Sequence, residues 1–484
     1  MQVKTAGTAH SKIGWQGLGA ALLSISLPAR GRLDIFEGET VSKIGLVDDE
    51  KGDPGTRTDE PEVSTSRAGR HRLTAIAFRF RVGYFGLFCL FFTPIPLLDL
   101  LGSTGPVTGW VGRTVFGTDA VPHPDSGAGD QTANWVLVFC VLVVAAVATV
   151  VWTAFDRRPA HPGLRAWFAL FLRLFLGSQL LSYGFAKLIP TQMPGPTLAQ
   201  LLERYGDLSP ASVLWLQVGS SPPYQVALGA VEVVGGLLLF VPRTAVLGAV
   251  VSVASMAQVF LTDMTYDIPE KLLSAHLLLI GLVLLAPYLR RLADVFVRQR
   301  ACEPLTQPPL FAGDRKNRVA LGVQVALGIW LAVGSGSDRW IVWQDQHGPG
   351  SARSELYGIW DVRDFAVDGR PVPPLTTDES RWQRLVFDAR GSATYQRMNG
   401  DLVPARADFR PGGQLELAAA TATDAGSPRP FATLRAERPA PDRLVLRGNL
   451  RDHPVAIVLD RVDPDSFTLR SRGFHWVQDY PYFR

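Results

Sequence analysis

Apolar and polar positions divide the chain into three regions. Residues 73–334 contain nearly all of the long apolar runs, whereas residues 1–66 are polar and rich in Gly, Asp, Glu, Ser and Thr. Residues 350–484 alternate between apolar and polar positions over short stretches. Long apolar runs predict membrane-spanning helices, and short alternating runs predict β-strands. We therefore expect a membrane all-α helical bundle followed by a C-terminal all-β antiparallel barrel.

Seven segments have the length and composition of membrane spans, for which about 20 mostly apolar residues are needed. These predicted spans are Val82–Leu101, Trp135–Val151, Ala166–Leu188, Tyr224–Val241, Ala245–Leu261, Leu272–Leu289 and Val319–Val333.

The basic residues between the predicted spans alternate between crowded and sparse connections. Arginines cluster before the first span and between the sixth and seventh, whereas Arg113 stands alone after the first. Because cytoplasmic connections carry an excess of Lys and Arg, the N-terminus is expected in the cytoplasm and residues 335–484 outside the cell membrane. If Val319–Val333 does not span, the C-terminal domain is cytoplasmic instead. Arg173, toward the cytoplasmic half of the third span, could pair with an acidic group or contact a lipid phosphate.

The expected domain organisation has five parts. They are residues 1–66, a disordered N-terminal extension; 73–161, two transmembrane helices; 164–292, a four-helix transmembrane core; 319–334, the seventh transmembrane helix; and 350–484, a soluble barrel. Disorder is expected for the extension because its apolar content is too low to form a core.

Ionisable side chains recur inside the four-helix core. In a bilayer such groups are costly and usually face the bundle interior. Tyr183 and Lys187 share one helix face, and Glu232 lies near the middle of the next span beside Gly229, where a neighbouring helix can approach closely. We predict that these groups converge in a pocket in the outer half of the membrane. Its candidate residues are Tyr183, Lys187, Glu232, Gln258, Asp263, Tyr266, Asp267, Lys271 and His276.

Structural roles are open alternatives for these residues. Lys187 and Lys271 lie near span ends, where lysines often reach the headgroups. Glu232 could form a purely structural ion pair with Lys187. Asp267 could cap the start of a helix. His276 could be a hydrogen-bonded core histidine rather than a ligand.

The connection Pro190–Pro223 is long for a membrane protein. Thr197–Tyr205 carries leucines on one side and charges between the faces, which predicts a short amphipathic helix on the outer membrane surface. Ser212–Val218 could form a second helix. Together these pieces could cover the predicted pocket.

The four central spans resemble DoxX-type membrane proteins. The elements that carry the resemblance are YGFAKLIPTQMP at 183–194, YGDLSP at 205–210, E-x-x-G-G at 232–236 and YDIPEK at 266–271. The resemblance implies a four-helix membrane bundle. Some members are small subunits of thiosulfate:quinone oxidoreductases, and others assist the maturation of periplasmic enzymes. The bundle also looks distantly similar to the transmembrane part of vitamin K-dependent carboxylases.

The cysteines, the net charge and the isolated histidines limit the kinds of site that we expect. Cys89, Cys140 and Cys302 are isolated and form no C-x-x-C motif, so we expect neither a disulfide framework nor a thioredoxin-like redox motif. The net charge of +4 is small and its basic residues are explained by topology, so no nucleic-acid partner is expected. His453 and His475 are lone, and we expect no metal site.

The short alternating runs of the C-terminal region predict a closed barrel of short strands. Gly358-Ile359-Trp360 matches the G-x-W of a lipocalin first strand, so the domain resembles a lipocalin-like barrel. The predicted strands are Leu356–Phe365, Gln383–Phe387, Ser392–Gln396, Gln414–Leu417, Phe431–Arg435, Arg443–Leu446, Val455–Leu459 and Ser466–Leu469.

Two classes of function are consistent with these features. In the first, the bundle is a component of a quinone-linked oxidoreductase that acts on a lipophilic molecule together with a redox partner. In the second, it is a non-catalytic scaffold or lipid-binding module that presents the barrel. Membrane lipids are expected partners in both, and the sequence leaves open whether the chain is an enzyme.

Overall fold

The computed structural model describes residues 61–92, 104–156, 158, 161–347, 353–420 and 429–483. The chain forms two compact units. Of the described residues, the first unit contains those up to Gln179, Gly236–Phe260 and Pro269–Trp330, and the second contains Leu180–Gly235, Leu261–Ile268 and those from Leu331 onward.

Seven helices among the described residues are long and apolar enough to cross a membrane, which confirms the predicted number. They are α2 (Pro61–Phe91), α5 (Thr132–Phe155), α6 (Pro162–Leu188), α8 (Pro222–Phe240), α9 (Ala245–Thr265), α10 (Lys271–Leu285) continued by η4 (Ala286–Tyr288) and α11 (Leu289–Phe296), and α12 (Asp314–His347). A helix satisfies its backbone hydrogen bonds internally, as a bilayer requires. The helical part is therefore compatible with a multi-pass membrane protein.

The first and last helices differ in extent from the predicted spans. The helix α2 begins at Pro61 and ends at Phe91. Residues 93–101 of the predicted first span and residues 1–60 of the predicted extension lie outside the described residues. The helix α12 continues to His347, well past the predicted end at Val333. An apolar run predicts only the part of a helix that can lie in the hydrocarbon core of a bilayer. The helix itself can continue through polar residues, because its backbone hydrogen bonds do not depend on apolar side chains.

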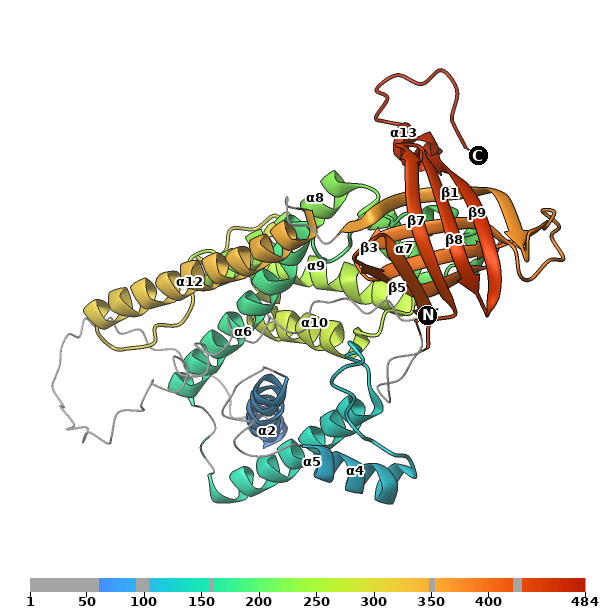
Figure 1. The fold of residues 1–484 in the computed structure, drawn as a ribbon. Helices are drawn as coiled ribbons and strands as arrows, with labels where there is room; N and C mark the ends of the chain where they lie inside the picture. Colours follow the sequence, from blue (N-terminus) through green and yellow to red (C-terminus); the bar gives the residue numbers. More distant parts are fainter. Residues whose placement is uncertain are drawn as a thin grey trace, which may run out of the picture. The chain divides into compact units, whose positions relative to one another are not determined.

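The helices α2 and α5 of the first unit lie side by side (Figure 1). Arg79 of α2 is buried, and its guanidinium donates to Thr153 Oγ1 at 3.2 Å and to the carbonyl oxygens of Asp156 at 2.6 Å and Arg158 at 3.0 Å. The last carbonyls of a helix have no partner within the helix. Arg79 therefore binds the chain just past the C-terminal end of α5 and fixes it against α2.

The C-terminal strands form a closed antiparallel barrel (Figure 1). The strands are β1 (Arg353–Val367), β2 (Arg370–Pro371), β3 (Trp382–Ala389), β4 (Ser392–Arg397), β5 (Leu402–Arg410), β6 (Gln414–Ala419), β7 (Ala432–Ala440), β8 (Arg443–Leu450) and β9 (His453–Val462). Each strand from β3 to β9 pairs with its neighbour in sequence, and β1 pairs with both β3 and β9. Closure of the sheet removes the exposed edges that would otherwise pair with other chains. The short strand β2 is an appendage that pairs with the end of β1.

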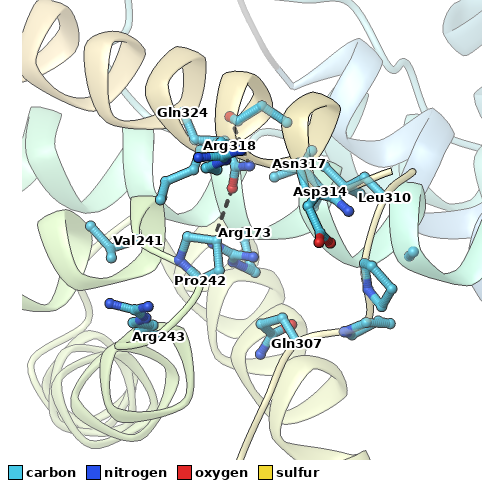
Figure 2. A pocket seen from close by; sticks show the side chains of 16 residues that line it. Arg173, Val241, Pro242, Arg243, Gln307, Leu310, Asp314, Asn317, Arg318 and Gln324 are labelled. Atoms are coloured by element: carbon cyan, nitrogen blue, oxygen red, sulfur yellow. Dashed lines mark hydrogen bonds between the residues drawn. The ribbon is translucent and has the colours of Figure 1, made fainter. Parts of the chain in front are cut away.

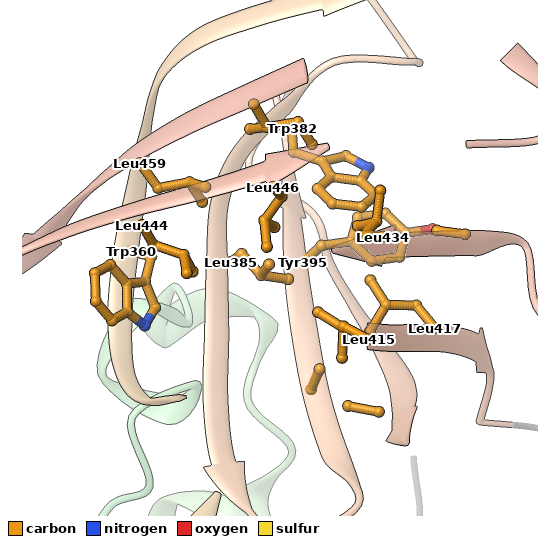
Figure 3. Packing of buried hydrophobic residues seen from close by; sticks show 14 of the residues in the cluster. Trp360, Trp382, Leu385, Tyr395, Leu415, Leu417, Leu434, Leu444, Leu446 and Leu459 are labelled. Carbon is orange, nitrogen blue, oxygen red and sulfur yellow. The ribbon is translucent and has the colours of Figure 1, made fainter. Parts of the chain in front are cut away.

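The barrel interior is lined by one continuous cluster of apolar side chains (Figure 3). Trp360 of the G-x-W sequence is fully buried there, and its indole N–H donates to the Leu356 carbonyl at 2.9 Å. On β8, Leu444 and Leu446 point inward and alternate with more exposed residues. An eight-stranded barrel is just wide enough for side chains to fill. The alternating pattern thus builds a packed core, as the sequence predicted.

Two details of the predicted barrel are wrong. The strand β5 was not predicted, because its inward residues Ala405 and Ala407 are too small to give a strong apolar alternation. The segment Ser466–Leu469 is not a strand. It contains parts of the short helices η5 (Pro464–Ser466) and α13 (Thr468–Ser471), of which the first is capped by Asp463.

The connection that follows α6 packs on the outside of the barrel. The amphipathic helix predicted over Thr197–Tyr205 is absent. This part of the connection contains the 3₁₀ turns η2 (Gln200–Leu202) and η3 (Tyr205–Asp207) instead. Leu198 is buried in a cluster with Ile359 and Val386. The apolar residues of this segment therefore cover the barrel wall. The helix expected at Ser212–Val218 is present as α7 (Pro210–Gly219).

Asp388 holds this segment to the barrel through its carboxylate. Oδ1 accepts the Leu198 N–H at 2.9 Å, and Oδ2 accepts the Ala199 N–H at 3.2 Å. Burial raises the pKa of the Asp388 carboxyl group, and the two N–H donors oppose this shift. We refer to Leu198, Ala199, Ile359, Val386 and Asp388 as the barrel junction.

The substitution Asp388→Ala should weaken the barrel junction. It leaves two N–H groups without their acceptor, which costs on the order of 1–3 kcal/mol. Hydrogen exchange at the Leu198 and Ala199 amides should therefore accelerate about tenfold or more. The matched control is Asp408→Ala, an exposed aspartate on β5, which should leave these amides unchanged. Unaltered exchange in Asp388→Ala would show that the carboxylate does not hold the segment.

The barrel junction should also depend on pH. Because the folded-state pKa of Asp388 is raised, its favourable contribution is complete below the unfolded-state pKa and is lost as the pH rises through the folded-state pKa. After correction for intrinsic rates, protection of the Leu198 amide should increase from pH 7 toward about pH 4. Asp388→Asn should lack this increase.

Candidate functional site

Lys187 and Glu232 form a buried ion pair in the second unit. The Lys187 Nζ lies 3.0 Å from Glu232 Oε1 and 2.9 Å from Oε2. The exposed fraction is 8% for the lysine side chain and 2% for the glutamate side chain. Removal of two charges from water costs several kcal/mol per ion, so each needs the other. The ion pair between these two residues, which the sequence left as an open alternative, is present in the structure.

Glycines bring the two helices of the pair close together. A Cβ atom at Gly229 of α8 would collide with the Leu188 nitrogen and the Gly184 carbonyl of α6. A Cβ atom at Gly184 would lie 2.9 Å from the Val233 nitrogen. Only glycine permits this approach, and it lets a lysine and a glutamate on adjacent helices meet.

Tyr183 completes this cluster. It precedes Lys187 by one helical turn on α6, and the Lys187 Nζ lies 6.0 Å from the centre of its ring. The ring is half-buried, and such a contact stabilises a cation through the electrons of the aromatic face. We refer to Tyr183, Lys187 and Glu232 as the ion-pair cluster.

Tyr266 belongs to an apolar cluster of the second unit. It packs against a group formed by Met193, Leu214, Val218 and Ile268. Gln225 of α8 is buried, and with its amide nitrogen facing the Met193 carbonyl it makes hydrogen bonds of 2.9 and 3.1 Å to the Met193 backbone. Tyr266 therefore contributes to packing around the connection that carries Met193.

His276 lies in an aromatic environment in the first unit. Its Nε2 is 2.8 Å from the Tyr84 hydroxyl, and its Nδ1 is 2.7 Å from the Leu272 carbonyl. Its ring stacks on Phe88 with the centroids 4.0 Å apart. Because a carbonyl accepts, Nδ1 carries the proton, and Nε2 of the neutral ring accepts from Tyr84. His276 thus has the geometry of a satisfied core histidine.

Asp130 caps the N-terminus of α10. Its carboxylate accepts the N–H groups of Lys271 and Leu272, both at 2.8 Å, and lies 3.8 Å from the Lys271 Nζ. The N–H groups of Gly129 and Asp130 donate to the Pro269 carbonyl. A residue more than a hundred positions earlier in the chain thus accepts two N–H groups at this helix start, and a capping role for Asp267 stays a prediction.

The other candidate residues occupy different environments. Asp267 is exposed and has a left-handed backbone with φ of 53°, which aspartate tolerates in turns. Asp263 is buried, and its carbonyl accepts the Ile268 N–H at 3.0 Å. Gln258 is exposed on α9. The structure thus unites three candidates, and the convergence of all nine in one pocket stays a prediction.

Sequence reasoning missed Tyr84, Phe88 and Asp130, which contact candidate residues. All three lie outside the four central spans on which the prediction concentrated. Phe80, Tyr84 and Phe88 recur at the four-residue spacing that places side chains on one helix face, which was a usable signal. Asp130 follows a glycine-rich stretch and gave no such signal. Within the described ranges, no cluster of three or more His, Cys, Asp or Glu side chains could hold a metal ion.

Comparison with known proteins gives one informative similarity. The chain is 28% identical over 133 residues to an uncharacterised protein, YwoB of Bacillus subtilis (strain 168), which covers 26% of this chain and 79% of YwoB. No protein-family model matches the chain, and no solved structure matches it. The similarity assigns no activity, so the function must be argued from the site.

A double-mutant cycle should measure the strength of the ion pair. Lys187→Met or Glu232→Met alone leaves one buried charge uncompensated and should lower the free energy of unfolding by about 3–5 kcal/mol. The double variant should lose much less than the sum, because two methionines fill a similar volume without charge. Unfolding in mixed micelles would measure all three variants.

The control for this cycle is the exposed pair Asp294 and Arg298, whose Nη1 and Oδ1 atoms are 2.7 Å apart. The cycle Asp294→Asn and Arg298→Gln should give a coupling below about 1 kcal/mol. A coupling just as small at Lys187 and Glu232 would mean that water reaches their charges.

Proposed function

We propose that the chain is a DoxX-like integral membrane protein that binds a quinone or a similar lipophilic molecule at the ion-pair cluster, as a component of a quinone-linked oxidoreductase. The observation that carries this proposal is the Lys187 ammonium group. It is buried, and its contacts with Glu232 account for two of its three N–H groups. One donor remains for a ligand.

A quinone fits the chemistry of this cluster. Its carbonyl oxygens accept hydrogen bonds, and its ring can lie against the half-buried face of Tyr183. Its isoprenoid tail is as apolar as the surrounding hydrocarbon. Glu232 balances the charge of the Lys187 ammonium group, which can polarise a carbonyl oxygen of the ligand. The electrons would come from a partner oxidoreductase.

A scaffold function is the second candidate, and the barrel junction favours it. Leu198 and Asp388 hold the connection after α6 to the barrel wall through apolar contact and two hydrogen bonds. In this case the ion-pair cluster only stabilises the helices, and the bundle serves to anchor the barrel.

Quinone binding distinguishes the two candidates. Purified wild-type protein should carry a quinone, visible as an ultraviolet difference spectrum on reduction. Lys187→Met/Glu232→Met should fold yet bind the added quinone at least tenfold more weakly, because the ammonium donor is gone. Asp294→Asn/Arg298→Gln, which removes an exposed pair, should bind as the wild type does. The quinone proposal is wrong if the wild-type protein takes up no quinone, or if the double variant binds quinone as well as the wild type. Either result would favour the scaffold function.

The proposed topology places the N-terminus in the cytoplasm and the barrel outside the cell membrane. It is supported by the arginine-rich connection between α11 and α12, since cytoplasmic connections are rich in basic residues. The helix α12 is 34 residues long, which is more than enough to cross a bilayer. It therefore supplies the seventh crossing.

The exposed thiol of Cys302 is a native reporter of this topology. In spheroplasts, a membrane-impermeant maleimide should leave Cys302 unlabelled until the membrane is permeabilised. Ser392→Cys in a Cys302→Ser background should be labelled at once, because residue 392 is exposed on the barrel. Cys302→Ser alone gives the background from the other two thiols. Immediate labelling of Cys302 would reverse the orientation.

A further inference from the structure

Two neighbouring cavities lie in the first unit, where they share the lining residues Arg173, Gln307 and Pro308. The larger has a volume of about 500 Å³ and the smaller about 300 Å³. Figure 2 shows the larger cavity, whose lining residues include Arg173, Arg243, Gln307 and Gln324. Ligand sites commonly have volumes in this range, roughly 300–1,000 Å³.

The charges around the two cavities are unbalanced. Five arginines line them, and Asp314 is the only acidic residue that does so. None of these arginines forms an ion pair with an acidic residue in the described part of the chain. The arginines are Arg81, Arg165, Arg173, Arg243 and Arg318. An anion would therefore be attracted to this region.

Arg173 is the buried member of this group, with only 4% of its surface exposed. Its Nε and Nη2 donate to the Leu239 carbonyl at 3.0 and 2.7 Å. Nη2 also donates to Gln324 Oε1 at 3.4 Å (Figure 2). These oxygens satisfy hydrogen bonds but carry no net charge. A buried guanidinium whose charge is not neutralised favours an anion beside it.

The smaller cavity adds an apolar wall to the basic site. Phe78, Phe168, Leu172, Val246 and Leu284 line it together with arginines. The Arg165 guanidinium lies 5.1 Å from the centre of the Phe78 ring, so charge and apolar surface meet at this point. A ligand that fits both cavities has an anionic group at one end and an apolar chain at the other.

We propose that these cavities bind the phosphate group of an anionic amphiphile such as a phospholipid, with the phosphate beside Arg173, Arg243 and Arg318 and an acyl chain along the apolar wall. Arginine recognises phosphate through paired N–H donors. Basic residues near span ends also set topology, but topology requires neither a buried arginine nor a cavity beside it. This site is separate from the ion-pair cluster and does not depend on the proposed quinone function.

Thermal unfolding of the full chain in neutral detergent tests the proposal. Phosphatidylglycerol should raise the unfolding temperature in a saturable way, and phosphatidylcholine should not. Arg173→Gln and Arg318→Gln should each weaken the apparent affinity for phosphatidylglycerol at least tenfold. The matched control Arg315→Gln removes the same charge one turn earlier on α12, outside the cavities, and should bind as the wild type does. If Arg173→Gln does not fold, Arg243→Gln and Arg318→Gln decide the outcome.

Water-soluble glycerol phosphate distinguishes the sources of the phosphate. Weak stabilisation by glycerol phosphate compared with phosphatidylglycerol supports a lipid, whereas equal stabilisation supports a soluble phosphate ester at the same arginines. The proposal is wrong if both phospholipids stabilise the wild type equally. It is also wrong if Arg318→Gln and Arg315→Gln reduce the affinity to the same extent, because charge alone would then explain binding.

Discussion

The cost of an unpaired charge in an apolar bundle constrains where this chain can place its ionisable groups. Lys187 and Glu232 meet this constraint by direct pairing within 3.0 Å. The pairing requires that α6 and α8 lie unusually close, which in turn requires glycine at the contact. The ion pair therefore depends on Gly229. A larger side chain at Gly229 would separate the helices and disturb the ion pair without altering either charged residue.

Arg173 meets the same constraint by a different route. Its Nε and Nη2 donate to the Leu239 carbonyl, which lies near the end of α8 where carbonyls lack helical partners, and Nη2 also donates to the Gln324 amide oxygen. These oxygen atoms are neutral, so the positive charge of the guanidinium persists. A paired charge can remain in a closed interior, whereas a charge satisfied only by neutral oxygens is stabilised further by an anion. The adjoining cavity gives space for one.

The apolar runs were sufficient to predict the number of long helices, because a bilayer leaves few alternatives for such runs. The contacts between distant segments were harder to predict. A pairing of Lys187 with Glu232 could be suggested from the sequence, because a buried charge is costly at each position and the two residues lie on neighbouring spans. Asp130 could not be assigned to α10, because a cap formed by a residue remote in sequence leaves no periodic pattern. Tyr84 gave a helical spacing but no indication that His276 was its partner.

The barrel shows how an exception to alternation can reveal a contact. Trp360 and Leu385 are paired across β1 and β3 and point inward, so the adjoining pair Ile359 and Val386 must point outward. Apolar side chains on an outer wall need a cover, and Leu198 provides it. Two apolar residues in succession at Ile359 and Trp360 thus indicate a strand buried on both faces. The covering segment and the barrel share this core, so the connection after α6 buries Ile359 and Val386 on the outer wall of β1 and β3.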